Sequence, residues 1–211
     1  MKINYITLEF FMIFISLPLF LYFFKGFLSP IPILLLIIGY IYYLYKIKQI
    51  HCESLYTLFP MRKKSLKKIF RRFLKVALLL FILLIIYDYK LLLYYVINLP
   101  YHWLATLFLY PLLSVLPQEI IFRGFFFTRY KSLFKSELLI VLSSLSFAFS
   151  HIVFHNIEAP ILALFGGFIF ALTYHQKRSL MLVVAEHSLY GLYLYTIGWG
   201  AYFNYGDVIL F

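Results

Sequence analysis

Three short stretches of the chain place polar side chains inside sequence that is otherwise apolar: LPQEIIFRG at 116–124, FAFSH at 147–151 and EHSLYG at 186–191. They combine carboxylates with imidazoles, a set that can take a proton from water and donate hydrogen bonds to an oxyanion. Ionisable groups inside apolar spans are costly and are therefore functional candidates by default. The candidate site residues are Gln118, Glu119, Arg123, His151, Glu186 and His187.

Spacing in the first stretch predicts which of its side chains meet. Glu119 and Arg123 are four residues apart, so on a helix they share a face and can form an ion pair. Gln118 points about 100° away from Glu119, because an α-helix turns by that amount per residue. Pro117 removes a backbone donor and loosens the turn, which often marks a working site in a membrane helix. A polar clamp that only holds helices together fits the same residues, and the spacing does not choose between the two interpretations.

The elements that must position these groups are membrane helices. Of the 211 residues, 64% are hydrophobic and only 13% are charged, whereas a soluble domain is about half apolar and a quarter charged. We therefore predict an all-α, polytopic integral membrane bundle that forms a single domain over 1–211. Cys52 is the only cysteine, which excludes an intrachain disulfide and a cysteine metal site.

Seven apolar stretches are long enough to cross a bilayer, which takes roughly 20 residues per helix. The first is interpreted as a retained anchor, because Lys2 is its only basic flank and no small-residue cleavage site follows. The motif-bearing core falls within 102–198. The predicted spans are 5–24, 28–46, 73–96, 102–123 (able to run on to 130), 138–157, 159–175 and 179–198.

Basic residues are distributed unevenly between the two sides of these spans. Of the 19 Lys and Arg, only Lys25 and Lys90 fall on one side. The positive-inside rule then predicts a multi-pass protein with a cytoplasmic N-terminus and the tail 199–211 outside. The formal charge of +11 is thus a signal of topology and of lipid contact, and no nucleic-acid partner is needed to explain it.

A basic loop, 47–75, precedes the third span, and it contains SLKKIFRRFLK at 65–75. Apolar residues recur there every three or four positions, with Lys and Arg on the other face. This pattern predicts an amphipathic helix that lies on the cytoplasmic leaflet and contacts anionic lipids over 62–75, at about 1 kcal/mol per basic side chain. A docking surface for the charged tail of a substrate is the alternative.

QEIIFR (118–123), FAFSH (147–151) and HSLYG (187–191), in this order, resemble the motifs of the CPBP family. These Abi-type proteins are intramembrane proteases related to the type II CAAX prenyl endopeptidases, and their motifs are Glu-Glu-x-x-x-Arg, Phe-x-x-x-His and His-x-x-x-Asn. The resemblance implies a helical membrane fold with a polar cavity, in which a glutamate and a histidine activate water for peptide-bond hydrolysis. It implies that the Arg supports the second Glu and that the third motif helps to hold the oxyanion. The resemblance also implies a location in the cell (inner) membrane. No cofactor is expected.

Two positions depart from the family pattern. Gln118 replaces the first Glu and cannot act as a base, and Gly191 replaces the final Asn. Glu119 is then one candidate base and Glu186 another. If neither acts, the protein is a catalytically silent membrane scaffold or immunity protein. We favour activity, because the costly buried charges remain, and expect membrane-tethered protein substrates, with C-terminal sorting tails as one class.

Other residues and other chemistries complete the expectations. The hydroxyl of Tyr190 could replace the donor lost at Gly191, and Asn156 is a second candidate support for the oxyanion. A zinc-dependent protease is an alternative, since His151 and His155 are four residues apart and His187 could be the third ligand. A proton-coupled transporter is another, because buried Glu and His also suit proton relays.

Overall fold

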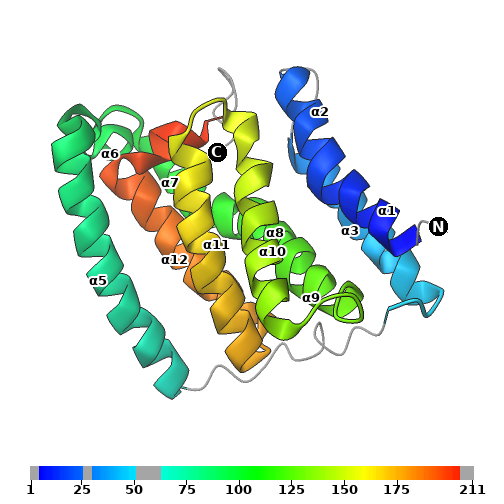
Figure 1. The fold of residues 1–211 in the computed structure, drawn as a ribbon. Coiled ribbons are helices and arrows are strands. Elements are labelled where there is room, and N and C mark those ends of the chain that lie inside the picture. The colour runs from blue at the N-terminus through cyan, green and yellow to red at the C-terminus, as the bar shows by residue number, and fades with distance from the viewer. Residues whose placement is uncertain (1–4, 26–29, 51–62, 205–211) are drawn as a thin grey trace.

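The structure is a computed structural model that describes residues 5–25, 30–50 and 63–204, and every regular element in these ranges is a helix (Figure 1). The long helices run alternately up and down, as expected for a polytopic bundle. The all-α, polytopic membrane fold predicted from the sequence is confirmed. Predictions made for Lys2, Cys52, Arg62 and the tail beyond 204 lie outside the described residues.

Five helices of the described residues are long and apolar enough to cross a membrane. Two further predicted spans are helical but do not meet both conditions: α3 (Pro30–Lys46) has only 17 residues, and α5 (Lys63–Asp88) begins with basic side chains. The five are Tyr5–Phe23, comprising α1 (Tyr5–Phe11), η1 (Met12–Ser16) and α2 (Leu17–Phe23); Pro100–Arg129; Ser136–Phe154, comprising α10 (Ser136–Ser150) and η5 (His151–Phe154); α11 (Glu158–Lys177); and α12 (Leu180–Ile197).

The third span differs from its prediction at both ends. The stretch 65–75 is not a separate surface helix, because α5 runs without interruption from Lys63 to Asp88 and contains neither Gly nor Pro to break it. At the other end the helix stops at Asp88 instead of reaching 96. A 3-10 turn, η2 (Tyr89–Leu91), follows, and Leu93 takes a left-handed conformation before α6 (Tyr94–Asn98). The amide of Leu93 donates to the Ile197 carbonyl (3.0 Å), which fixes this corner against α12.

The helix Pro100–Arg129 carries the first motif, and it runs on to Arg129, confirming the longer of the two predicted ends. Two π-helical segments flank the short α8 (Leu116–Glu119), and α7 (Pro100–Leu109) and α9 (Phe126–Arg129) lie beyond them. The segments are η3 (Tyr110–Val115) and η4 (Ile120–Phe125). Pro117 follows η3 by two residues and lacks the N–H that would close an α-turn, which accounts for the wider winding before it.

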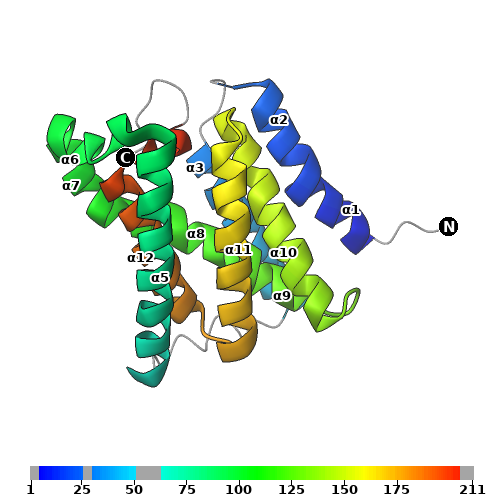
Figure 2. The ribbon, with the colours of Figure 1, turned by 60° about the vertical axis from the view of Figure 1, so that its left-hand side comes forward.

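The helices pack in a row of layers (Figures 1 and 2). The N-terminal hairpin, made of Tyr5–Phe23 and α3, lies beside α10 at one side of the molecule, and α5 lies against α12 at the other. The motif-bearing helices α8 to α12 occupy the space between. Side chains from three layers can therefore face one another around α8.

A buried polar cluster attaches the N-terminal hairpin to the bundle. Arg129 donates two hydrogen bonds of 2.9 Å to the carboxylate of Glu9. Tyr130 donates to the same carboxylate at 3.0 Å, and Tyr40 does so at 2.6 Å. We call these four residues the hairpin clamp. Neither charged residue was among the candidates picked from the sequence, although the same rule of costly ionisable groups in apolar spans applies to Glu9.

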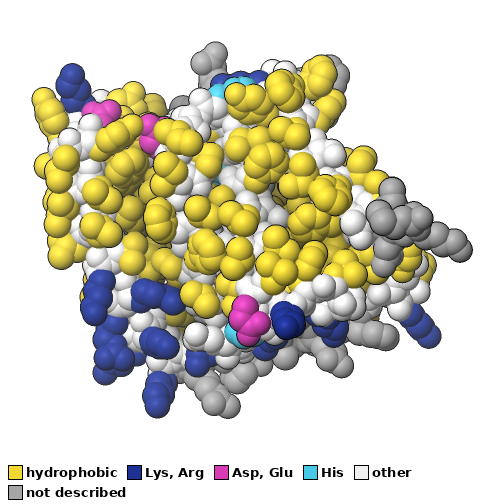
Figure 3. Space-filling view, viewed as in Figure 1, with side chains coloured by type: hydrophobic (Ala, Val, Ile, Leu, Met, Phe, Trp, Pro, Cys, Tyr) yellow, Lys and Arg dark blue, Asp and Glu magenta, His cyan; other side chains and the backbone are white. Residues whose placement is uncertain are grey.

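Side chains at the surface divide by type along the axis of the bundle. Figure 3 shows a broad apolar band across the middle, with Lys and Arg gathered at the lower end, where α5 begins and α11 ends. An apolar belt of this kind is the surface that a polytopic helical bundle presents to a lipid bilayer.

Candidate active site

Glu119 and Arg123 form the ion pair that their spacing predicts. Both side chains are fully buried, and the guanidinium donates to Glu119 Oε1 at 3.1 Å. Arg123 also donates to the Gly167 carbonyl of α11 at 3.2 Å, and its guanidinium carbon lies 4.5 Å from the centre of the Phe147 ring and 5.5 Å from that of Phe170. The pair therefore joins η4 to α10 and α11.

His187 reaches this pair from α12. Its Nδ1 lies 2.7 Å from Glu119 Oε1, and its ring stacks on Phe170 at 4.5 Å between centres. An ionised carboxylate only accepts hydrogen bonds, so Nδ1 carries the proton and Nε2 of the neutral ring keeps its lone pair. That Nε2 lies 3.3 Å from the hydroxyl of Tyr110. The imidazole is thus held from both sides, by a carboxylate and by a phenol.

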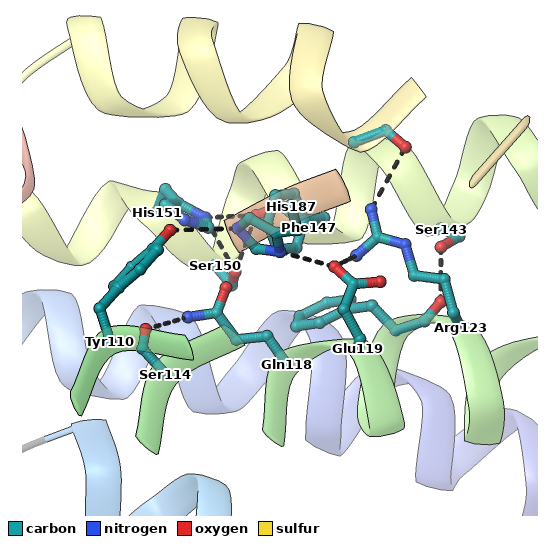
Figure 4. Close-up of polar contacts among 12 residues, drawn as sticks. Tyr110, Ser114, Gln118, Glu119, Arg123, Ser143, Phe147, Ser150, His151 and His187 are labelled. Carbon is teal, nitrogen blue, oxygen red and sulfur yellow. Dashed lines mark hydrogen bonds and ion pairs between the residues drawn. The ribbon is translucent and has the colours of Figure 1, made fainter. Parts of the chain in front are cut away.

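His151 is fixed in the same tautomer by a different partner. Its Nδ1 lies 2.7 Å from the Phe147 carbonyl oxygen, an acceptor, so its Nε2 also keeps a lone pair. The ring of Phe147 contacts both imidazoles, with ring centres 4.6 Å from His151 and 5.5 Å from His187. Glu119 and His187 therefore meet directly, as predicted, whereas His151 is connected to His187 only through the ring of Phe147 (Figure 4).

Gln118 and His151 line a cavity of about 100 Å³ between the N-terminal hairpin and the bundle. Its other lining side chains are apolar except for Ser150, so His151 is the one ionisable side chain among the lining residues. The Gln118 amide donates to Ser114 Oγ at 2.8 Å, and its buried Oε1 has no hydrogen-bond partner among the described residues. Glu119 does not line this space.

The part of the chain that contains this cluster matches a known protein family. Residues 100–193 match the family model described as Type II CAAX prenyl endopeptidase Rce1-like. This confirms the relationship predicted from the three motifs, and the family is one of intramembrane proteases. Searches of curated proteins and of solved structures gave no match.

The Rce1-like segment contains Glu186, but the structure turns this carboxylate away from Glu119 and the cavity. Glu186 forms an ion pair with Arg72 of α5, and Arg72 also donates to Thr173 Oγ1 at 2.6 Å. Neighbouring residues of a helix differ by about 100° in direction, so His187 faces α8 while Glu186 faces α5. The suggestion that Glu186 supplies the missing carboxylate of the first motif is not supported by this arrangement.

Tyr190 also faces α5. Its ring packs edge-on against Phe73 at 5.3 Å between centres. The hydroxyl beside His187 belongs instead to Tyr110, on the opposite helix. No sequence signal singled out Tyr110, since it is one of 20 tyrosines in the chain.

Asn156 is likewise engaged elsewhere. Its side chain donates to the Tyr202 carbonyl at 2.7 Å and accepts from the Ala159 amide at 2.8 Å. These contacts cap the start of α11 and tie it to the turn after α12, so the polar atoms of Asn156 are engaged in holding these two elements together.

The histidines suggested as zinc ligands are not gathered. His155 adopts a left-handed conformation and stacks on Tyr22 of the hairpin, with ring centres 4.3 Å apart. Within 5–25, 30–50 and 63–204, no three His, Cys, Asp or Glu side chains are grouped closely enough to hold a metal ion. The set His151, His155 and His187 does not form a ligand cluster here.

Proposed function

We propose that this protein is an intramembrane endopeptidase that cuts membrane-associated protein substrates at the cavity beside Gln118 and His151. The observation that carries the proposal is that this cavity combines apolar walls with one imidazole whose Nε2 is free to accept a proton. The match of residues 100–193 to a family of intramembrane proteases supports the same conclusion.

The arrangement favours His151 over either carboxylate as the general base. Gln118 cannot take a proton, and Glu119 is fully enclosed between Arg123 and His187. The unpartnered Oε1 of Gln118 suits a hydrogen bond from water at the cavity, which would orient that water beside His151. Gln118 thus acts as a positioning group.

The proposed reaction consumes one water molecule, and His151 takes up one proton and then releases it. The water oxygen bonds to the carbonyl carbon of the scissile peptide while His151 Nε2 takes the water proton. The tetrahedral intermediate collapses, the C–N bond breaks, and the protonated His151 returns the proton to the leaving amine. Glu119, Arg123 and His187 hold the helices around this centre in register.

The apolar cavity walls indicate the class of substrate, and the surface charge indicates how the protein is oriented in the membrane. The cavity lies against the N-terminal hairpin, which contributes apolar side chains such as Leu17 and Leu34, so an apolar, membrane-tethered segment is the fitting substrate. C-terminal sorting tails are one such class. The basic end of the bundle, which includes the start of α5, would face the cytoplasm of a cell membrane and contact anionic lipids.

Because Gln118 cannot act as a base, a second candidate function also fits this cavity. A cavity that holds an apolar segment beside an amide could bind such a segment without cutting it, as a membrane scaffold or immunity protein would. Adding a carboxylate at position 118 distinguishes the two functions.

The test is cleavage of single-span reporter proteins, each with a tethered apolar helix, by the purified protein in lipid nanodiscs. We expect His151→Asn to lower the rate by about 10²- to 10⁴-fold, the usual contribution of a general base. His155→Asn and Glu186→Gln are matched controls outside the cavity and should retain cleavage, with thermal unfolding confirming that each variant is folded. Loss of cleavage in Glu119→Gln with retention in His151→Asn would show that the base is misassigned. Cleavage by Gln118→Glu, but not by wild type, would identify a silent relative.

A further inference from the structure

Tyr110 and Gly191 meet where η3 crosses α12. A Cβ atom placed on Gly191 would lie 2.2 Å from the Tyr110 hydroxyl oxygen and 2.4 Å from the ring carbon Cε1. These separations are far below a van der Waals contact, so no side chain fits at position 191 while Tyr110 occupies this place. The backbone at Gly191 needs no positive φ, and its requirement for glycine is therefore one of space.

The hydroxyl that fills this space has a defined partner. Tyr110 Oη lies 3.3 Å from His187 Nε2, whose other nitrogen already donates to Glu119. Because Nε2 of the neutral ring is an acceptor, the phenol donates and the imidazole accepts. The three side chains form one directed chain, from Tyr110 through His187 to Glu119, which continues to Arg123.

The local backbone explains why this tyrosine is presented to α12. Tyr110 begins the π-helical segment η3, and the next residue, Pro111, has no N–H to donate. The Tyr110 ring is also braced edge-on by Tyr195, one turn after Gly191, at 5.5 Å between ring centres.

We propose that Tyr110 is the positioning residue for His187, and that glycine stands at 191 so that this hydroxyl can reach the imidazole from the opposite helix. The inference rests on the proposed endopeptidase function, because it gives the Tyr110–His187 contact a role in turnover. The phenol donates its one O–H to His187 Nε2, and this hydrogen bond fixes the tautomer and the ring orientation of that imidazole. Tyr190, one turn from His187 on the same helix, does not take this role.

The first experiment needs no substrate. The ¹⁵N signals of His187 are compared by NMR in nanodiscs for wild type, Tyr110→Phe and the matched control Tyr190→Phe. We expect the Nε2 signal to move in Tyr110→Phe and to stay in place in Tyr190→Phe. An unchanged Nε2 signal in Tyr110→Phe overturns the inference.

The second experiment measures kcat and KM on the single-span reporters. Tyr110→Phe should lower kcat roughly 10- to 100-fold, the size of effect seen for hydrogen bonds that orient metal-binding imidazoles, with KM little changed. Rescue is the sharper readout. In a Tyr110→Ala background, Gly191→Asn places an amide donor where the hydroxyl was, and it should restore part of the lost kcat, whereas Gly191→Ala should not.

The outcomes separate this inference from the proposed function. If wild type cuts the reporters and Tyr110→Phe cuts them equally fast, the role of Tyr110 is wrong and the endopeptidase assignment stands. If the Asn and Ala variants at 191 behave alike, the donor role is wrong as well. If neither wild type nor any variant cuts a reporter, the catalytic role falls with the proposed function, and the NMR comparison decides the contact alone.

Discussion

The hairpin clamp offers the most direct test of how this membrane fold is held together. Glu9→Gln keeps the shape of the side chain but removes its charge, leaving Arg129 without an ionic partner. The two side chains are only 6% and 4% exposed, so water screens their interaction little. Breaking a buried ion pair by removing one partner costs about 3–5 kcal/mol, and we expect a loss of that size in the free energy of unfolding.

The assay is reversible unfolding in mixed micelles, followed by tryptophan fluorescence. The exposed hydrogen bond between Tyr87 and Glu158 (2.5 Å) provides the matched control, because Glu158→Gln should change the free energy by less than about 0.5 kcal/mol. The double variant Glu9→Leu/Arg129→Leu removes both charges and should be more stable than Glu9→Gln, since replacing a buried pair with apolar groups is often neutral.

Two results would refute this reasoning. A loss in Glu9→Gln no larger than that in Glu158→Gln would mean that Arg129 finds water or lipid phosphate as a substitute. A double variant as unstable as the sum of its single variants would mean that the two charges do not interact.

Three further predictions concern backbone and packing. Gly167→Ala should destabilise the protein by about 1–3 kcal/mol, because its Cβ would press on the Ser144 backbone at 3.2 Å. Gly39→Ala has nothing within 4 Å of its Cβ and should stabilise the protein by about 0.5–1 kcal/mol. Unfolding curves of the two variants, measured side by side, test this pair. Gly198→Ala should cost at least about 1–3 kcal/mol, since Gly198 has φ +131° and a Cβ there would lie 2.2 Å from the Leu91 carbonyl oxygen; a variant as stable as wild type would contradict this. Asn156→Ala should lose about 1 kcal/mol through the missing helix cap, measured as a lower melting temperature. Asn156→Asp keeps the acceptor for the Ala159 amide but loses the donor to the Tyr202 carbonyl, so it should restore only the cap.

Features that depend on composition and local spacing were predictable from the sequence. The lengths of the hydrophobic stretches predicted the helices, and the four-residue spacing of Glu119 and Arg123 predicted their ion pair. The order of the three motifs gave the family that residues 100–193 match.

Features that depend on which helices become neighbours were not predictable. The direction of Glu186 followed from its partner Arg72, more than 100 residues away in α5. Tyr110 reaches His187 from the π-helical η3 through the space that Gly191 leaves, and a single tyrosine in an aromatic-rich chain does not reveal this contact. The break at Leu93 likewise depends on a contact with Ile197.

The polar contacts of this bundle also impose an order of events on its biosynthesis. Glu9 is separated from Arg129 by 120 residues, Arg72 from Glu186 by 114, and Glu119 from His187 by 68. At roughly 5–20 residues per second, Glu9 would wait about 6–24 s at the translocon before its partner is made. The first helix therefore enters the bilayer before the arginine that pairs with its acid exists, and the hairpin clamp can be completed only after α9 has been synthesised.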